Sequence, residues 1–346
     1  MWRGWLALTA LFLLVGCGPK VHRQQSYVFG TLVEITVYGE EEAKARRVTD
    51  QVLKDFDELH QTLHPWEPGT LERINTLLAL ATPGAPARAS LPPGVIPILR
   101  DATRLSELSE GLFNPAIGNL VRLWGFHSDS FEPRLPAPAS IDKLVQAKPR
   151  MADLRVDGLT LNGTNPAVRL DLGGYAKGYA LDLAAIYLRS QGVNNALVNI
   201  GGNVLALGNK GGQPWKVGIQ HPRQAGALAV LELQDGEAIG TSGDYQRFFE
   251  VGGKRYCHLI DPRTGWPADQ AQAVTVIARG PHAGTLSDVA SKPLFIGGPT
   301  AWRGLATKMG IDAALFVAAD GQITVTRALN QRLVWESEAP AARVVD

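Results

Sequence analysis

The sequence has no excess of charge of either sign. Its 346 residues include 34 Lys and Arg and 33 Asp and Glu, which gives a formal net charge of +1. Nucleic-acid-binding proteins usually carry a basic face or stripe, so this balance argues against nucleic acid as a partner. Apolar residues make up 45% of the chain and charged residues 19%. This composition supports a large hydrophobic core and excludes a disordered chain.

Long apolar runs are also missing, except for a short one near the N-terminus. Residues 6–15 form this run after the basic residue Arg3, and the run is too short to cross a bilayer stably. Such a segment is typical of a secretory signal, and an N-terminal anchor helix is the alternative. Its end, Leu-Val-Gly-Cys, resembles a bacterial lipobox, in which the chain is cleaved before a cysteine that carries lipid.

This resemblance gives a domain organisation and a location. We expect residues 1–16 to be a lipoprotein signal peptide, Cys17 to be lipidated, residues 17–26 to be a tether and residues 27–346 to form the folded domain. The protein is then expected at the periplasmic face of a bacterial membrane, with the inner and outer membranes both left open.

Cysteine is scarce. Once Cys17 is assigned to lipid, only Cys257 remains, so a disulfide framework is excluded and stability must come from the core. Cys-x-x-Cys and His-Glu-x-x-His motifs are absent, and the seven histidines are scattered along the chain. Any bound metal is therefore expected to be a hard cation on oxygen ligands.

The periodicity of apolar residues predicts an α+β fold rather than a doubly wound sheet, because strands and helices do not alternate regularly. The predicted helices are residues 40–63, 95–109, 172–191 and one near 299–309. The predicted strands are residues 26–38 with a bend at Gly30, hairpin strands at 154–161 and 167–172, and several short strands between 196 and 334, with a surface loop at 126–139.

Residues 169–183, RLDLGGYAKGYALDL, are suited to an anionic ligand. A predicted strand brings Asp171 to a Gly-Gly turn that opens a helix, so backbone N–H groups and a helix N-terminus converge there. A phosphate or a metal-bound diphosphate fits such a corner. The alternative is an ordinary strand-to-helix turn in which Asp171 is a cap. The Rossmann and P-loop glycine motifs are both absent.

Residues 238–267 contain many polar and aromatic residues. Strand alternation places Cys257 and His258 on opposite faces, which argues against a Cys-His nucleophilic pair. His258 stands at a strand end, immediately before the turn Asp-Pro-Arg-Thr-Gly, where a side chain can reach a ligand. A hydrogen-bonded structural histidine is the alternative.

Five segments together resemble the ApbE family of FAD:protein FMN transferases. They are residues 29–39, 112–126, 171–182, 197–222 and 241–267. They occur in family order and span nearly all of the mature chain. The resemblance implies an α+β fold with a T-fold-like core, mixed and mostly antiparallel sheets with flanking helices, FAD bound in a cleft, and Mg²⁺ at the diphosphate.

The resemblance also implies a reaction. A Ser or Thr hydroxyl of a client protein attacks the FMN-side phosphorus of FAD, AMP leaves, and FMN stays attached through a phosphoester. Periplasm-facing or membrane-bound electron-transfer proteins are the expected clients. By similarity, His258 is the base that takes the hydroxyl proton, since a neutral imidazole with a pKa of about 6.5 can accept it.

Further roles follow from matching positions in the family. Flavin-ring contacts are implied for Phe29 and Trp66, pocket-lining positions for Asn114 and Ala116, and contacts to the ribityl, phosphate or adenosine parts for Asp171, Lys177 and Ile260.

The sequence departs from the family at one implied metal position. The family commonly has Thr four residues after a metal-binding Asp near a helix start, and this chain has Lys292 four residues after Asp288. Lys292 cannot donate a lone pair to Mg²⁺ and repels it. Asp288, the Gly174 carbonyl and Ser291 remain candidate ligands. Pro293 suggests that the helix begins nearer Ser291 than Ser287.

Three interpretations of Lys292 remain open. The side chain turns outward and changes nothing, the three candidate ligands still hold one Mg²⁺, or the ammonium takes the place of the cation and contacts the diphosphate. The last interpretation also leaves a second function open. This alternative is a non-catalytic or weakly catalytic FAD-binding periplasmic lipoprotein.

Overall fold

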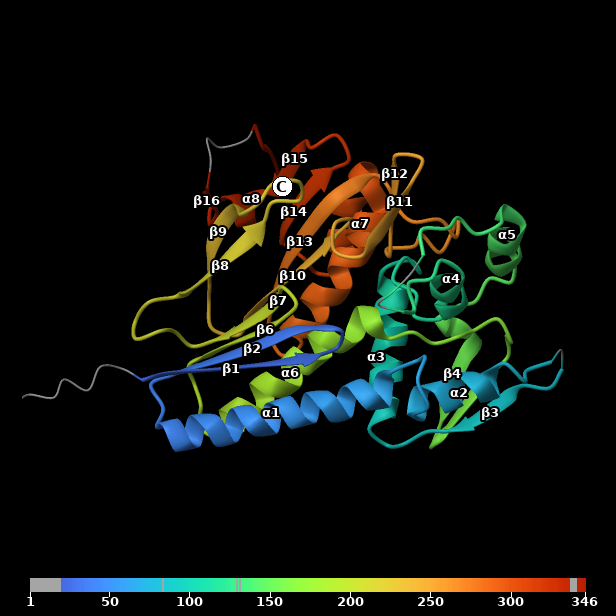
Figure 1. Ribbon diagram of the computed structural model, residues 1–346, viewed down its shortest axis with the longest axis horizontal. Helices are drawn as coiled ribbons and strands as arrows, with labels where there is room; N and C mark the ends of the chain where they lie inside the picture. Colours follow the sequence, from blue (N-terminus) through green and yellow to red (C-terminus); the bar gives the residue numbers. More distant parts are fainter. Residues whose placement is uncertain (1–19, 83, 129, 131, 337–340) are drawn as a thin grey trace, which may run out of the picture.

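The computed structural model of the protein describes residues 20–346, apart from residues 83, 129, 131 and 337–340 (Figure 1). The predicted signal peptide and Cys17 lie outside these residues. The helices are α1 (Glu42–Leu63), α2 (Thr70–Leu78), α3 (Val95–Leu108), α4 (Gly118–Leu123), α5 (Pro138–Gln146), the short 3-10 helix η1 (Met151–Asp153), α6 (Gly173–Ser190), α7 (Ala283–Lys308) and α8 (Arg327–Asn330).

The strands form one large sheet and three small ones. The large sheet has the order β1 (Val21–Val28), β2 (Thr31–Tyr38), β6 (Ala196–Ile200), β7 (Asn203–Leu207), β10 (Glu237–Gly243), β13 (Ala271–Arg279), β14 (Ala313–Ala318), β15 (Ile323–Thr326) and β17 (Arg343–Val345). The small sheets are β16 (Val334–Trp335) with β9 (Ala227–Leu233) and β8 (Trp215–Gln220), β3 (Ala87–Ser90) with β5 (Thr160–Gly163) and β4 (Leu154–Asp157), and β11 (Phe248–Val251) with β12 (Lys254–Cys257).

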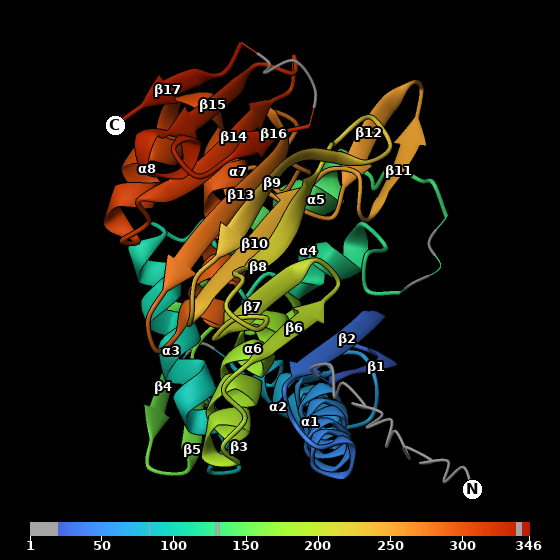
Figure 2. The same ribbon diagram turned by 90° about the vertical axis from the view of Figure 1, so that its left-hand side faces the viewer.

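Neighbouring strands of the large sheet are antiparallel except at β15 and β17, which are parallel. This confirms the predicted α+β class with mostly antiparallel sheets. Both faces of the sheet are covered. Helices α6 and α7 pack together, α7 lies against β10 and β13, and α1 runs beneath β1 and β2 (Figure 1). The sheet of β8 and β9 covers the opposite face of the central strands (Figure 2).

Burial on both faces explains why the central strands are almost continuously apolar. In β13 every residue from Ala271 to Ala278 is buried. One core lies between the sheet and the helices and includes Val274 and Leu294. The second core lies beneath β8 and β9 and includes Ile277 and Leu231. A sheet with two buried faces holds its strand ends rigidly, which fixes the loops that carry the site.

The predicted helices at 40–63, 95–109 and 172–191 are confirmed as α1, α3 and α6. The strand predicted for residues 26–38 is wrong, because it is two strands. Val28 pairs with Thr31, and Phe29 and Gly30 between them have φ of 56° and 69°. Positive φ at both positions is typical of a two-residue hairpin turn, which follows the right-handed twist of the strands.

The predicted tether also needs correction. Strand β1 begins at Val21 and pairs with β2 throughout, so residues 21–26 belong to the large sheet. As an edge strand, β1 alternates exposed and half-buried side chains up to Tyr27, which is why its sequence carries little apolar signal.

Two further predicted elements differ. The single strand predicted for residues 154–161 is wrong, because β4 and β5 form a hairpin within residues 154–163. The strand predicted at 167–172 is not part of this hairpin. Instead, the backbone N–H groups of Arg169 and Asp171 donate to the carbonyls of Ala116 and Pro115. This pairing between distant segments leaves no local pattern in the sequence.

Helix α7 begins at Ala283, so the predicted start near Ser291 is wrong, and Pro293 lies inside the helix. Gly298, with φ of 69°, interrupts the helix, and the part after it matches the helix predicted at 299–309. Proline in a helix costs about 3 kcal/mol. Complete burial of Val289 and Leu294 around it offsets that cost, since each such side chain stabilises by about 1.5–3 kcal/mol.

Within residues 20–346, outside the gaps given above, no helix combines the length and apolar character needed to cross a membrane.

Candidate active site

A cavity of about 780 Å³ opens between the β1–β2 hairpin, the N-terminal turns of α6, the middle of α7 and the end of β12. Most of the residues singled out in the sequence line it. These are Phe29, Trp66, Asn114, Asp171, Gly174, Lys177, His258, Ile260, Asp288 and Lys292. The cavity is large enough for a drug-sized or dinucleotide-sized ligand.

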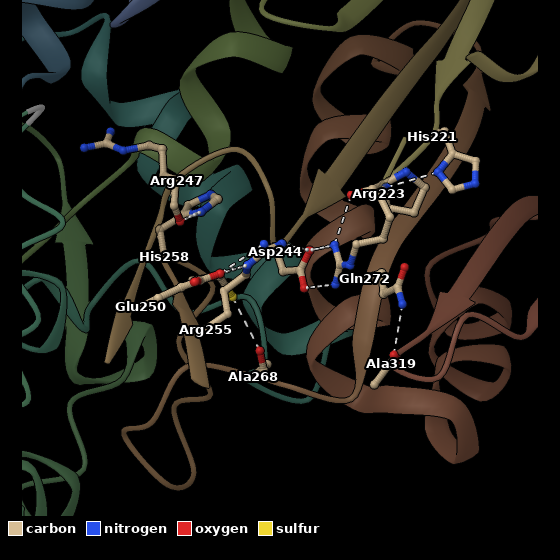
Figure 3. Close-up of polar contacts among 12 residues, drawn as sticks. His221, Arg223, Asp244, Arg247, Glu250, Arg255, His258, Ala268, Gln272 and Ala319 are labelled. Carbon is tan, nitrogen blue, oxygen red and sulfur yellow. Dashed lines mark hydrogen bonds and ion pairs between the residues drawn. The ribbon is translucent and has the colours of Figure 1, made fainter. Parts of the chain in front are cut away.

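His258 lies one residue beyond the end of β12. Its backbone N–H donates to the carbonyl of Arg247 at 3.0 Å, and its Nδ1 lies 3.2 Å from the same carbonyl oxygen (Figure 3). A carbonyl only accepts, so Nδ1 carries the proton and Nε2 keeps its lone pair. Burial lowers the pKa of His258 to about 3, helped by the positive charges of Arg247 and Lys177. The imidazole is therefore neutral and able to accept a proton at Nε2.

The loop that carries Arg247 is anchored by Asp244. The carboxylate of Asp244 receives two hydrogen bonds from Arg223, at 2.7 and 2.6 Å, and Arg255 lies 3.6 Å away (Figure 3). The backbone N–H of Asp244 also donates to the carbonyl of Gln272 at 3.0 Å. These contacts fix the carbonyl of Arg247, which in turn fixes the tautomer and the orientation of His258.

Cys257 belongs to the core and not to the site. Its side chain is 2% exposed, its Sγ donates to the carbonyl of Ala268 at 3.4 Å, and burial raises its pKa to about 12. A thiol with such a pKa supplies no nucleophilic thiolate at neutral pH. The prediction that Cys257 and His258 do not act as a pair agrees with this geometry.

Three basic side chains line the cavity that contains Asp288, namely Lys177, Arg247 and Lys292. Burial lowers the pKa of Lys177, and the positive charges of Lys292 and Arg247 lower it further, whereas Asp288 raises it. Arg247 donates to the carbonyls of Phe126 at 3.2 Å and Ser128 at 2.8 Å. This concentration of positive charge favours a ligand with several negative charges.

Sequence reasoning assigned no role to Arg247, although residues 241–267 contain it. Its contribution depends on a backbone carbonyl and on distant partners such as Phe126, which no local pattern encodes.

Asp171 lies where the predicted turn meets α6. Its Oδ1 accepts the backbone N–H of Gly173, the first residue of the helix, at 2.9 Å. Burial raises the pKa of this carboxyl, and the hydrogen bond from Gly173 together with the charge of Arg247 opposes that rise. Asp171 therefore caps the turn, as one interpretation of the sequence proposed, and it also lines the cavity.

Aromatic rings form another part of the wall. The ring of Phe29 lies 5.9 Å from that of Phe56 and 5.5 Å from that of His60. Trp66 is covered by the guanidinium of Arg169 at 4.6 Å. Phe29 holds a positive φ, which is uncommon for a bulky residue and is a form of strain found at functional sites. A flat apolar ligand fits against such rings.

The other pocket positions differ in their exposure. Asn114 lines the cavity, but its side chain is used within the protein, donating to the carbonyl of Pro149 and accepting from the N–H of Ala116. Ile260 also lines the cavity. Ala116 is fully buried and does not line it, because its backbone pairs with Arg169. The expectation that Ala116 lines the pocket is therefore wrong.

Two of the three candidate metal ligands, Asp288 and Ser291, already make hydrogen bonds within the protein. Lys292 Nζ lies 2.6 Å from Asp288 Oδ1 and 2.8 Å from the main-chain oxygen of Asp288. Asp288 Oδ2 accepts the N–H of Gly178 at 2.9 Å. Charge attraction from Lys292 and Lys177 outweighs burial and holds the pKa of Asp288 below its usual value. This carboxylate is ionised and paired, so Lys292 does not turn outward.

Ser291 is also unsuited to bind a cation from the cavity. It is 1% exposed and does not line the cavity, and its hydroxyl lies 2.8 Å from both the main-chain oxygen of Asp288 and the hydroxyl of Ser242. Among the described residues, no three His, Cys, Asp or Glu side chains are grouped as metal ligands. The residues present in this arrangement do not fit a Mg²⁺ ion at Asp288.

Comparison with known proteins gives a consistent result. The model of the ApbE family matches residues 29–315. A curated FAD:protein FMN transferase of Rhodobacter capsulatus is 40% identical to this chain. The matched region covers 89% of this chain and 57% of the length of that relative. Another, from Klebsiella pneumoniae, is 35% identical over 75% of this chain and 78% of the relative.

A solved structure agrees in fold. The crystal structure of the ApbE protein of Thermotoga maritima superposes with a TM-score of 0.81 at 29% identity, covering 92% of this chain and 100% of that one. With a family match over most of the chain and a cavity built from the matching segments, this chain belongs to the ApbE family.

Proposed function

We propose that the protein transfers the FMN part of FAD to a Ser or Thr hydroxyl of a client protein. The carrying observation is the Nε2 lone pair of His258, which borders a large cavity beside Lys177, Lys292 and Arg247. The names of the curated relatives support the same reaction class.

In this proposal, Nε2 of His258 takes the proton of the attacking hydroxyl. The hydroxyl oxygen forms a bond to the FMN-side phosphorus, the bond between that phosphorus and the bridging oxygen breaks, and AMP leaves with the bonding electrons. The three basic side chains offset the negative charge of the diphosphate as it redistributes. The carbonyl of Arg247 stabilises the imidazolium that forms, because it continues to accept from Nδ1.

The remaining wall supports the proposed ligand. Phe29 and Trp66 provide the apolar surface for the flavin rings, and Ile260 adds to it. Gly173 and Gly174, at the N-terminus of α6, line the cavity, and the dipole of the helix favours an anionic group there. The family resemblance also implies Mg²⁺ at the diphosphate. Since the donor set at Asp288 does not fit that ion, the proposed steps are carried by the protein's own residues.

The proposed clients are periplasm-facing or membrane-bound electron-transfer proteins, and the proposed location is the periplasmic face of a bacterial membrane, through lipid on Cys17. Detergent partitioning tests the anchor. Wild-type protein should enter the detergent phase and Cys17→Ser should not, whereas wild-type protein found wholly in the aqueous phase would refute it.

Intact-mass spectrometry tests the reaction. A client domain incubated with FAD and the enzyme should gain the mass of FMN less water, and AMP should appear in equal amount. Fragmentation should locate the addition on a Ser or Thr. A protein that binds FAD but leaves the client mass unchanged would support the alternative of a non-catalytic FAD-binding lipoprotein, which the occupied carboxylate of Asp288 favours.

A further inference from the structure

We propose that Lys292 is the built-in cation of this site and that its ammonium binds the diphosphate of FAD without a divalent metal. The inference rests on the proposed function, because it takes FAD as the ligand. It concerns a different property, which is the source of the positive charge beside Asp288.

The ammonium of Lys292 has a free donor. One N–H donates to Asp288 Oδ1 at 2.6 Å and a second to the main-chain oxygen of Asp288 at 2.8 Å. The third N–H has no acceptor in the part of the chain that the structure describes. The side chain of Lys292 is 16% exposed and lines the cavity, whereas that of Asp288 is 2% exposed. A phosphate oxygen entering the cavity is a suitable acceptor for the third N–H.

Both carboxylate oxygens of Asp288 accept hydrogen bonds from other residues of the protein. Oδ1 faces Lys292, and Oδ2 accepts from the backbone of Gly178. A divalent ion placed against Oδ1 would have to displace the ammonium and leave it in contact with a second cation. Breaking a buried ion pair in this way is strongly unfavourable.

Gly174 leaves room for the stem of Lys292. A Cβ at this position would lie 2.9 Å from Cε and 3.1 Å from Cδ of Lys292. The absence of a side chain in the first turn of α6 therefore lets the lysine stem pass to Asp288. In this arrangement Gly174, which the sequence analysis suggests as a metal ligand, packs against the residue that replaces the metal.

The charges around Asp288 suit the proposed ligand. Lys177, Lys292 and Arg247 all act electrostatically on His258, and Lys177 is influenced by the other two and by Asp288. Three cations face one carboxylate in this group, so the charge beside Asp288 is positive and favours the two negative charges of a dinucleotide diphosphate. Asp171 lines the same cavity.

The experiment is a titration of FAD into the apoprotein, followed by flavin fluorescence and equilibrium dialysis, in EDTA and in Mg²⁺. For the wild type, the two Kd values should agree within about threefold. Lys292→Thr should bind FAD at least about tenfold more weakly in EDTA, and Mg²⁺ should restore part of that loss because an oxygen ligand replaces an ammonium. Lys308→Ala, which removes a lysine of the same helix outside the cavity, is the matched control and should behave as the wild type.

The outcomes separate the two proposals. A wild-type Kd that weakens about tenfold or more in EDTA would overturn the role of Lys292 and leave the transferase proposal standing. An absence of FAD binding in both media would overturn the proposed function itself. The wild-type comparison decides the inference even if Lys292→Thr does not fold. A second readout is the melting temperature of the apoprotein. Mg²⁺ alone should leave this temperature unchanged, and a saturable increase with Mg²⁺ concentration would contradict the proposal.

Discussion

The low pKa of His258 leads to an unusual pH dependence. In the free enzyme, burial and the charges of Arg247 and Lys177 lower this pKa to about 3, so the imidazole is already neutral well below pH 6. An ordinary histidine, with a pKa of about 6.5, is only about 3% neutral at pH 5 and would lose about thirtyfold in rate between pH 8 and pH 5. With a pKa of about 3, about 99% of the base stays neutral at pH 5, so no such loss is expected.

The appropriate measurement is kcat/KM for FAD as a function of pH, since this ratio reports the ionisation of the free enzyme. Transfer to a client domain should be followed by intact mass at FAD concentrations below KM. A fall of about thirtyfold centred near pH 6.5 would refute the reasoning. Because burial also raises the pKa of Asp171, Asp171→Asn is the control. A loss at low pH that disappears in this variant belongs to Asp171.

Three further substitutions test the surroundings of the site. Cys257→Ser should change transfer less than about threefold, because Cys257 is buried, bonded to Ala268 and unable to ionise; a large loss in the same mass assay would contradict this. Phe29→Asn should change the free energy of unfolding by less than about 1 kcal/mol, because Asn tolerates the φ of 56° at this position. FAD titration should show weaker binding to this variant, and an unchanged affinity would show that Phe29 does not contact the flavin. Gly178→Ala should lower the free energy of unfolding by about 1–3 kcal/mol in denaturant, because the added Cβ would lie 2.4 Å from the carbonyl oxygen of Gly284. Gly304→Ala, where a Cβ meets open space, should not destabilise the protein. Equal stability of the two variants would contradict the close packing of α6 and α7.

The sequence predicted correctly those helices whose ends and apolar faces are encoded by neighbouring residues. The apolar period of α1 and the Gly-Gly start of α6 indicated both helices to within two residues. The hairpin at Phe29 and Gly30 was missed because a bulky residue rarely adopts a positive φ, so the turn looked like a bend within one strand. Helix α7 was misplaced because Pro293 is a helix breaker in isolation, and its cost is offset only by tertiary burial.

The same distinction holds for the site. Motifs matched to the family placed His258, Asp171 and Lys177 correctly at one cavity, although they are far apart in the chain. The ion pair of Lys292 with Asp288 was not predicted, because spacing alone does not give the direction of a side chain. Arg247 orients His258 through its backbone carbonyl, which any residue has, so this contact leaves no signal in the sequence.

The central claim is that His258 acts as a base at Nε2 and does not serve mainly to hold FAD. The most direct test compares FAD affinity with transfer in His258→Asn, using fluorescence titration for the first and intact mass of a client domain for the second. The account predicts a Kd for FAD within a few-fold of the wild type and a transfer rate lower by about 10²–10⁴. An equal loss of affinity and transfer, or a variant that still transfers FMN at the wild-type rate, would contradict it.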